Sequence, residues 1–295
     1  MNWFRSCITS DYRLSWIGVS SGGGAVLTGW LAPASLDEAL SLRAEHGDDA
    51  TVLAGGTFLG ILRNQGFIDP ATLLSLGRVP ELRGVAVVDG ELRLGAMVTH
   101  RRVERGEACA AWPALQRAFG LVASPRVRNQ ATVGGVLADA DYASDPPAML
   151  TALGARAVLR SPRGERTVSM QELILGYYET CIAPDELLVE VRVPPQAGRA
   201  VYRKFRSRSS EDRPCVAVAA AADADGGVRV VVGAVADTPQ LYPDLCAVAG
   251  DPARAAEVGQ GYADRIEPIS DARGSAAYRR RVTAVEVRRA LEALA

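Results

Sequence analysis

The sequence predicts an α+β protein built of several modules, and three observations support this fold class. Stretches typical of helices and of strands are mixed over the first two thirds of the chain. Two apolar strands around an Asp-Gly-Gly turn then precede helical sequence, an order typical of α+β units. Neither a Walker loop nor a GxGxxG motif is present, so a doubly wound dinucleotide-binding sheet is not indicated.

Composition narrows the class of protein. The 295 residues suffice for one large domain or two to three smaller ones. With 33 basic and 34 acidic residues, the chain has no general attraction to nucleic acid or anionic membranes. Its five cysteines are scattered, which argues against a zinc or iron–sulfur site in this chain and fits a reducing cytosol. No run approaches the ~18 apolar residues of a membrane span, and no secretory signal is evident, so we expect a cytoplasmic protein.

The N-terminal part divides into an extension and a first set of elements. We expect residues 1–28 to be an extension, with Gly22 to Gly24 as a flexible joint, or to be sequence upstream of the natural start. A helix is predicted after Ser35, which stands three residues before Glu38 in capping-box spacing, and Gly47 follows its last turn. The stretch "ATVLAGGTFLGILRN" then predicts a short strand, a glycine break and a second apolar run.

The middle of the chain is predicted to alternate strand and helix. "ELRLGAMVTH" is typical of a strand that ends at the polar pair Thr99-His100. "WPALQRAFGLVA" predicts a helix with Pro113 in its first turn. "ATVGGVLADADYASDPPAML" predicts a strand end, a glycine turn, an acidic loop and a helix that Gly154 stops.

The remaining elements are a hairpin, a strand, a second hairpin and a long helix. The first hairpin turns across Pro162 to Glu165. In "ELLVEVRVP", alternation places Val189, Val191 and Val193 on one face, and the Pro194-Pro195 pair that follows marks a domain boundary. The second hairpin contains the Asp-Gly-Gly turn. The last helix is amphipathic, and its buried candidates are Val282, Val285, Leu291 and Leu294.

Two glycine turns are candidates for anion binding. "AGGT" at 54–57 and "TVGG" at 132–135 could each present consecutive backbone N–H groups to a diphosphate, because glycine permits positive φ and close approach. A single Gly-Gly turn is weak evidence, and an ordinary turn at a strand end explains either one alone.

The acidic loop between the second turn and Pro146 has competing interpretations. Asp145 precedes Pro146, so spacing alone favours a helix N-cap at Ser144 or Asp145. Asp139 and Asp141 are either solvated loop residues or acceptors of hydrogen bonds from ribose hydroxyls. A hydrolase built on this carboxylate pair would need a proton donor that the sequence does not indicate.

These motifs occur together, and in the same order, in one family. From about residue 30 to the C-terminus, the chain resembles the FAD-binding medium subunit of molybdenum hydroxylases, the group of carbon monoxide dehydrogenase and the xanthine dehydrogenase type. The matching pieces include "ATVLAGGTFLGILRN", "LRLGAMVTH", "RVRNQATVGGVLADADYASDPPAMLTALGA", "YRKFRSRSSED" and "DARGSAAYRRRVTAVEVRRAL". Each glycine turn is unspecific, but this ordered set is highly specific.

The resemblance implies a fold and a domain division. It implies a two-lobed FAD-binding domain of the p-cresol-methylhydroxylase type over residues 29–195, with lobes at about 29–80 and 81–195. A smaller C-terminal α+β domain over residues 196–295 would follow.

The resemblance also implies a non-covalent FAD site. The expected cofactor-binding residues are Val52, Leu53, Ala54, Gly55, Gly56, Thr57, Phe58, Leu59, Thr99, His100, Thr132, Val133, Gly134, Gly135, Asp145, Leu188 and Lys204. The two glycine segments would flank the diphosphate, Asp145 would contact the sugar–adenine half, and Leu188 would touch the flavin region. Lys204 would lie near the isoalloxazine, although in "YRKFRSR" it is also typical of a surface lysine. No residue of this chain is expected to be catalytic or to bind a metal.

The sequence departs from the family pattern at two places in the cofactor region. Val136 replaces the asparagine that usually follows the second glycine pair, which removes a side-chain hydrogen-bonding group. Tyr142 stands where the family often has proline. Because the expected cradle donors are main-chain N–H groups, the cradle could survive both changes.

The function implied is that of an electron-transfer flavoprotein subunit. Its partners would be a small subunit with two [2Fe–2S] clusters and a large molybdopterin subunit, in a dimer of heterotrimers. Electrons would pass from the clusters through FAD to an external acceptor, while substrate is oxidised on the large subunit. Two alternatives stay open: a stand-alone FAD-dependent oxidoreductase with its own substrate pocket, and an FAD-free scaffold subunit, which Val136 makes conceivable.

Overall fold

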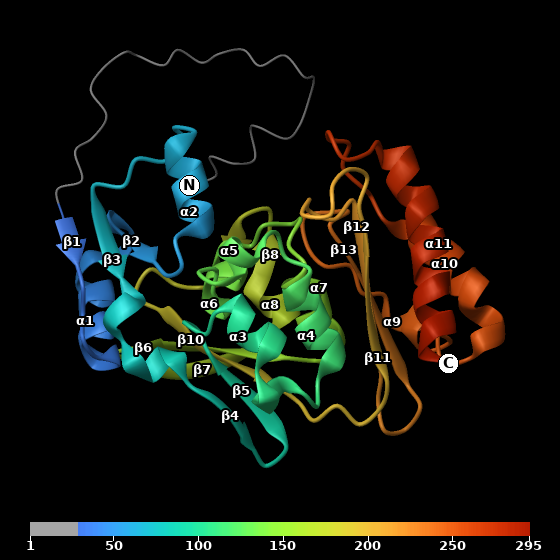
Figure 1. Cartoon of the computed structure of the whole chain (residues 1–295), viewed down its shortest axis with the longest axis horizontal. Coiled ribbons are helices and arrows are strands. Elements are labelled where there is room, and N and C mark those ends of the chain that lie inside the picture. The colour runs from blue at the N-terminus through green and yellow to red at the C-terminus, as the bar shows by residue number, and fades with distance from the viewer. Residues whose placement is uncertain (1–28) are drawn as a thin grey trace.

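Helices and strands form three units in the computed structural model, which describes residues 29–295 (Figure 1). The α+β fold class predicted from the sequence is confirmed, because helices and strands are mixed along the chain and the two sheets after the first unit are antiparallel. The interpretation of residues 1–28 as an extension with a glycine joint lies outside the described residues. Short 3-10 turns lie at Gly47–Asp49, Leu76–Arg78, Pro80–Arg83, Glu107–Cys109 and Pro252–Arg254.

The first unit is a parallel three-stranded sheet with two helices. Its strand order is β1-β3-β2. The strands are β1 Gly29–Leu31, β2 Ala50–Leu53 and β3 Thr72–Ser75, and the helices are α1 Leu36–His46 and α2 Thr57–Asn64. The predicted start of α1 is confirmed, because the Ser35 hydroxyl accepts a hydrogen bond from the Glu38 N–H at 3.2 Å.

The second unit is an antiparallel five-stranded sheet with helices packed on it. The strand order is β4-β5-β10-β6-β7, and β6–β7 is the predicted hairpin. The strands are β4 Val85–Val88, β5 Glu91–Gly95, β6 Arg156–Ser161, β7 Gly164–Ser169 and β10 Leu187–Val193, with a small pair β8 Ile174–Gly176 and β9 Glu179–Thr180. The helices are α3 His100–Arg105, α4 Pro113–Gly120, α5 Pro125–Arg128, α6 Val133–Ala138, α7 Pro146–Ala152 and α8 Met170–Leu173.

The third unit is an antiparallel three-stranded sheet covered on both faces. It contains β11 Ala200–Phe205, β12 Val216–Ala222, β13 Val228–Gly233, α9 Pro243–Cys246, α10 Ala255–Arg265 and α11 Ala276–Leu294. The predicted hairpin around the Asp-Gly-Gly turn is confirmed as β12–β13. Ala217 and Ala219 of β12 pack into the core of the second unit, while Val216 and Val218 pack against the core that α10 and α11 share. The sheet therefore joins the third unit to the second (Figure 1).

Two strand expectations need correction. Strand β5 ends at Gly95 and not at Thr99-His100, because the chain turns there and Met97 N–H donates to the Leu82 carbonyl at 2.8 Å. Val189 does not share a core with Val191 and Val193. A register shift between Leu188 and Glu190 turns Val189 into the cluster of the first unit.

Two helix expectations also need correction. The two glycines of "TVGG" lie in the first turn of α6 and not at the end of a strand. In α11, Leu291 and Leu294 are buried as predicted, but Val285 is 39% exposed. The buried face of α11 instead includes Arg279, Thr283 and Glu286. Because these residues are polar, a search for apolar residues at helical spacing does not identify this face.

Candidate functional site

A cavity of about 570 Å³ lies where the three units meet. The β2–α2 turn, residues 131–145, the start of β10 and strand β11 all contribute to its wall. Most residues predicted to contact a cofactor line it: Val52, Ala54, Gly55, Gly56, Thr57, Phe58, Leu59, His100, Thr132, Gly134, Gly135, Asp145, Leu188 and Lys204. Leu53, Thr99 and Val133 lie outside that lining. The volume and the mixed polar and apolar wall suit a small organic ligand.

The first glycine turn presents unused backbone donors to the cavity. Gly56 adopts the left-handed conformation at φ 69° immediately before α2 begins. Within the described residues, the backbone N–H groups of residues 55–59 donate no hydrogen bond. Because N–H groups at a helix start point outward and carry partial positive charge, this turn is a site for an anion such as a diphosphate.

The second glycine turn does not supply free donors, contrary to the sequence expectation. Val133 N–H donates to the Val98 carbonyl and Gly134 N–H to the Ala96 carbonyl, at 2.9 and 2.8 Å. Gly135 N–H donates to the Thr132 hydroxyl at 3.1 Å. Glycine is needed at 134 because a Cβ would lie 2.6 Å from the Ala96 Cβ. This turn therefore shapes the cavity wall by packing.

The two turns are held against each other. A Cβ at Gly55 would lie 2.1 Å from the Gln130 carbonyl oxygen, so only glycine permits this approach. A Cβ at Gly135 would lie 3.7 Å from the Ala54 Cβ. Val136, which replaces the family's asparagine, lines the same cavity and packs against the core of the second unit.

Asp145 is a buried ion-pair partner, not the side-chain cap that spacing favoured. It precedes Pro146 of α7 but makes no capping hydrogen bond. Its carboxylate accepts from the Tyr202 hydroxyl at 2.7 Å and from Lys204 Nζ at 2.9 Å. Burial raises the pKa of Asp145 and lowers that of Lys204, and the attraction between the two opposes both shifts.

Lys204 is not a surface lysine. Its side chain is only 1% exposed, and Nζ also donates to the Leu121 carbonyl at 2.9 Å. Lys204 belongs to strand β11 of the third unit, whereas Asp145 belongs to the second unit. The ion pair therefore connects the two units. The pair fixes the cavity wall where these units join.

The other two aspartates of the acidic loop lie close together in the cavity wall. Asp141 is buried and pairs with the Arg213 guanidinium at 2.9 Å. Asp139 is half-buried, and burial together with the charge of Asp141 raises its pKa to about 7, against the opposing charge of Arg213. Neither is a fully solvated loop residue, and Asp139 exchanges a proton near neutral pH.

His100 is a neutral group with a free ring nitrogen. Nε2 lies 3.2 Å from the Thr132 carbonyl oxygen, so this nitrogen carries the hydrogen. Burial lowers the His100 pKa to about 4. Nδ1 is buried without a partner in the described part of the chain. Thr99, its neighbour, caps α3 by accepting from the Arg102 N–H at 3.3 Å.

Several charged residues of the cavity wall were missed in the sequence. Arg43 lines the cavity from α1, and its Nε is buried without a partner in residues 29–295. Glu186 lines it from the turn before β10, and Glu211 and Arg213 from the segment after β11. Glu211 lies within the family-matching piece "YRKFRSRSSED", but no local pattern assigns a cavity role to these positions, because each reaches the cavity only through the packing of segments distant in sequence.

Comparisons with known proteins agree with this site. Residues 25–196 match the family described as FAD binding domain in molybdopterin dehydrogenase. Residues 200–294 match the CO dehydrogenase flavoprotein C-terminal domain. The chain belongs to the family of FAD-binding subunits of the molybdopterin dehydrogenases. The resemblance stated from the sequence is confirmed.

Relatives of this FAD-binding family align over nearly the whole chain. The nicotine 6-hydroxylase medium subunit of Paenarthrobacter nicotinovorans is 31% identical over 89% of this chain and 95% of that protein. The carbon monoxide dehydrogenase medium chain of Hydrogenophaga pseudoflava is 33% identical over the same shares, 89% and 95%. In the crystal structure of quinoline 2-oxidoreductase from Pseudomonas putida 86, one chain is 30% identical with a TM-score of 0.83, covering 90% of this chain and 96% of that one.

The described part of the chain offers neither a metal cluster nor a membrane-spanning helix. No group of three or more His, Cys, Asp or Glu side chains in that range is placed to hold a metal ion. None of the helices in that range has both the length and the apolar composition that crossing a membrane requires.

Proposed function

We propose that this chain is the electron-transfer flavoprotein subunit of a molybdenum hydroxylase complex and that it holds FAD non-covalently in the cavity between the three units. The observation that carries the proposal is the β2–α2 turn, whose unpaired N–H groups face a cavity large enough for an organic cofactor. Family membership supports the same ligand.

Different residues of the cavity would bind different parts of FAD. The N–H groups of residues 55–59 would bind the diphosphate, and Gly134 and Gly135 would let the opposite wall approach it closely. His100 Nδ1 and Arg43 Nε are buried polar atoms that a ligand could satisfy. Leu188 supplies an apolar part of the wall, and the Asp145–Lys204 pair fixes the wall where the second and third units join. Bound FAD would supply the redox chemistry.

We further propose the domain bounds and the partner subunits that the sequence predicts. Residues 29–195, with lobes at about 29–80 and 81–195, would form the FAD-binding domain, and residues 196–295 would close the cavity from the other side. A small subunit with two [2Fe–2S] clusters would deliver electrons, and a large molybdopterin subunit would oxidise the substrate in the cytoplasm. The names of the relatives support this, because they are medium subunits or chains of multi-subunit hydroxylases and dehydrogenases.

Purification of the tagged full chain from its native cells tests this role. We expect a complex that contains about four iron atoms and one molybdenum atom per FAD, because two [2Fe–2S] clusters carry that iron. In stopped-flow reduction, the cluster absorbance should bleach no later than the flavin absorbance. A chain that purifies alone and whose flavin is reduced directly by an organic substrate would instead be a stand-alone oxidoreductase.

A further inference from the structure

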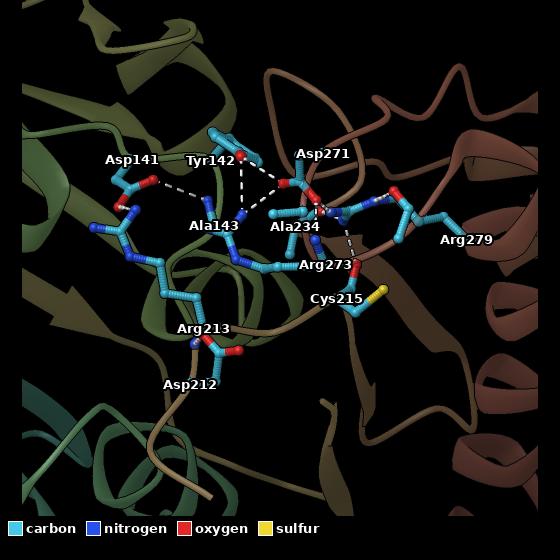
Figure 2. Close-up of polar contacts among 12 residues, drawn as sticks. Asp141, Tyr142, Ala143, Asp212, Arg213, Cys215, Ala234, Asp271, Arg273 and Arg279 are labelled. Carbon is cyan, nitrogen blue, oxygen red and sulfur yellow. Dashed lines mark hydrogen bonds and ion pairs between the residues drawn. The ribbon is translucent and has the colours of Figure 1, made fainter. Parts of the chain in front are cut away.

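Tyr142, which departs from the family pattern, makes contacts that a proline could not make. It lies in the cavity loop between Asp141 and Ala143, but its side chain reaches across to the third unit (Figure 2). Its hydroxyl donates to Asp271 Oδ2 at 3.0 Å and accepts from Arg273 at 3.0 Å. The Arg273 guanidinium lies 5.9 Å from the centre of the Tyr142 ring. One side chain thus ties the acidic loop to the turn before α11.

The acceptor of this bond belongs to a rigid charged cluster. Asp271 pairs with Arg273 at 2.6 Å and with Arg279 at 2.6 Å. Arg279 is 0% exposed and donates to the carbonyls of Cys215 and Ala234. Burial would raise the pKa of Asp271, but hydrogen bonds from the Arg273 N–H and from Arg279 lower it overall. Asp271 is therefore an anchored carboxylate.

The hydroxyl of Tyr142 is suited to this partner. Burial raises the pKa of Tyr142, so the hydroxyl keeps its proton at neutral pH and can donate it to the carboxylate. Tyr177 packs edge-on against the Tyr142 ring with 5.4 Å between ring centres. The ring is thereby in contact with both an aromatic group and a cation.

The same cluster anchors the segment that brings charge to the cavity. Residues 206–214 leave β11 and return at Cys215, whose N–H donates to the Phe205 carbonyl at 2.8 Å. The Cys215 carbonyl is held by Arg279. From this closed segment, Arg213 pairs with Asp141 at 2.9 Å and lies 5.6 Å from the centre of the Phe58 ring. Figure 2 shows both connections, one on each side of the acidic loop.

We propose that Tyr142 is a positioning residue that latches the acidic cavity loop onto the third unit and so holds the Asp141–Arg213 pair at the cavity wall. Asp141 pairs with Arg213, and the next residue, Tyr142, bonds to Asp271. Arg279 connects these two partners, because it pairs with Asp271 and also donates to the carbonyl of Cys215, two residues after Arg213. Loss of the Tyr142 bond leaves the Asp141–Arg213 pair, together with the bonds of Asp145 to Tyr202 and Lys204, to hold the loop on the third unit. The effect of the latch on FAD rests on the proposed function, but the latch itself does not.

Limited proteolysis of the FAD-free full chain tests the latch directly. Trypsin can cleave after Arg206 and Arg208, since residues 207–211 are exposed, whereas Pro214 protects the bond after Arg213. Tyr142→Phe keeps the ring and removes only the hydroxyl. We expect cleavage at Arg206 and Arg208 to be about tenfold faster, the change for one lost hydrogen bond to a charged group when cleavage follows local opening.

The matched control is Tyr177→Phe. Tyr177 is the adjacent ring, and its hydroxyl makes no hydrogen bond within residues 29–295. This variant should be cleaved at the wild-type rate. Equal cleavage of Tyr142→Phe and wild type would overturn the latch. Equal acceleration in both variants would also overturn it, because the effect would then not depend on the bond from the Tyr142 hydroxyl to Asp271.

FAD binding tests the consequence for the cavity. In the FAD-loaded chain, Tyr142→Phe should shift the flavin reduction potential and increase quenching of flavin fluorescence by iodide. In the Arg213→Gln background, Tyr142→Phe should add no further change, because the latch acts through the Asp141–Arg213 pair. If the effects of Tyr142→Phe and Arg213→Gln on the flavin add, the latch does not act on the cavity through the Asp141–Arg213 pair. Failure of the wild-type chain to bind FAD would sink the proposed function, while the proteolysis result would still decide the latch.

Discussion

At the scale of single residues, Asp139 makes the molecule sensitive to pH near neutrality. Burial and the charge of Asp141 raise its pKa to about 7 in the folded chain, against the attraction of Arg213. An aspartate in an unfolded chain titrates near pH ~4. Between about pH 4 and pH 7 the folded chain therefore holds a proton that the unfolded chain has released, and the free energy of unfolding falls as pH rises. Asp139→Asn should flatten this dependence in urea denaturation.

The control for this measurement is Asp225→Asn in the exposed turn between β12 and β13. It should leave the wild-type pH dependence in place. An unchanged slope in Asp139→Asn would show that Asp139 titrates as in an unfolded chain.

A second residue-scale prediction concerns the Asp145–Lys204 pair. Asp145→Asn or Lys204→Met leaves one buried charge without its partner, so each should lower the free energy of unfolding by ~3–5 kcal/mol. The double variant leaves no unpaired charge and should be more stable than the sum of the two losses. Urea denaturation of all four chains measures this coupling. Strict additivity would mean that the pair contributes no mutual stabilisation.

Single residues are where sequence reasoning was least complete. The spacing before Pro146 favoured a cap at Asp145, but a cap and a buried ion pair both call for aspartate, and only the position of Lys204 in space decides between them. Arg43 and Arg213 resemble ordinary surface arginines in the sequence, yet both line the cavity. Burial of a charge depends on contacts between distant segments, which one sequence does not display.

At the scale of elements, the start of α2 carries the anion site. Thr57 is its first helical residue, and proline fits this position while removing one N–H donor. The preceding Gly56 has no Cβ to clash with a proline ring. Thr57→Pro should therefore weaken FAD binding roughly tenfold to a hundredfold, the value of one hydrogen bond to a charged group. Fluorescence titration of FAD measures the loss.

Thr57→Ala is the control for that variant, because it removes the hydroxyl and keeps the N–H. It should bind FAD nearly as wild type does. If Thr57→Pro also bound normally while remaining folded by circular dichroism, the N–H groups of this turn would not be the diphosphate site.

Elements with strong local signals were predicted well. The cap at Ser35, the turn from Pro162 to Glu165 and the Asp-Gly-Gly turn each contain the residues that fix their own geometry. The end of β5 and the short helix α6 were missed, because long-range bonds from Met97 and Gly134 set them. Tertiary hydrogen bonding overrode the local pattern there.

At the scale of the whole molecule, the cavity exists only where all three units meet. The β2–α2 turn, the acidic loop and β11 come from different units, and the third unit also packs into the core of the second. The fold class was predictable from the mixture of elements. The charged wall of the cavity was not, because it arises from how those units dock.

The measurement that tests the central claim most directly is the amount of FAD retained by the purified full chain after incubation with excess FAD and gel filtration. We predict visible flavin absorbance that co-elutes with the protein at about one FAD per chain, since residues 29–295 form one continuous cavity lined by the β2–α2 turn. A folded chain that elutes without flavin, both alone and within its complex, would contradict the account.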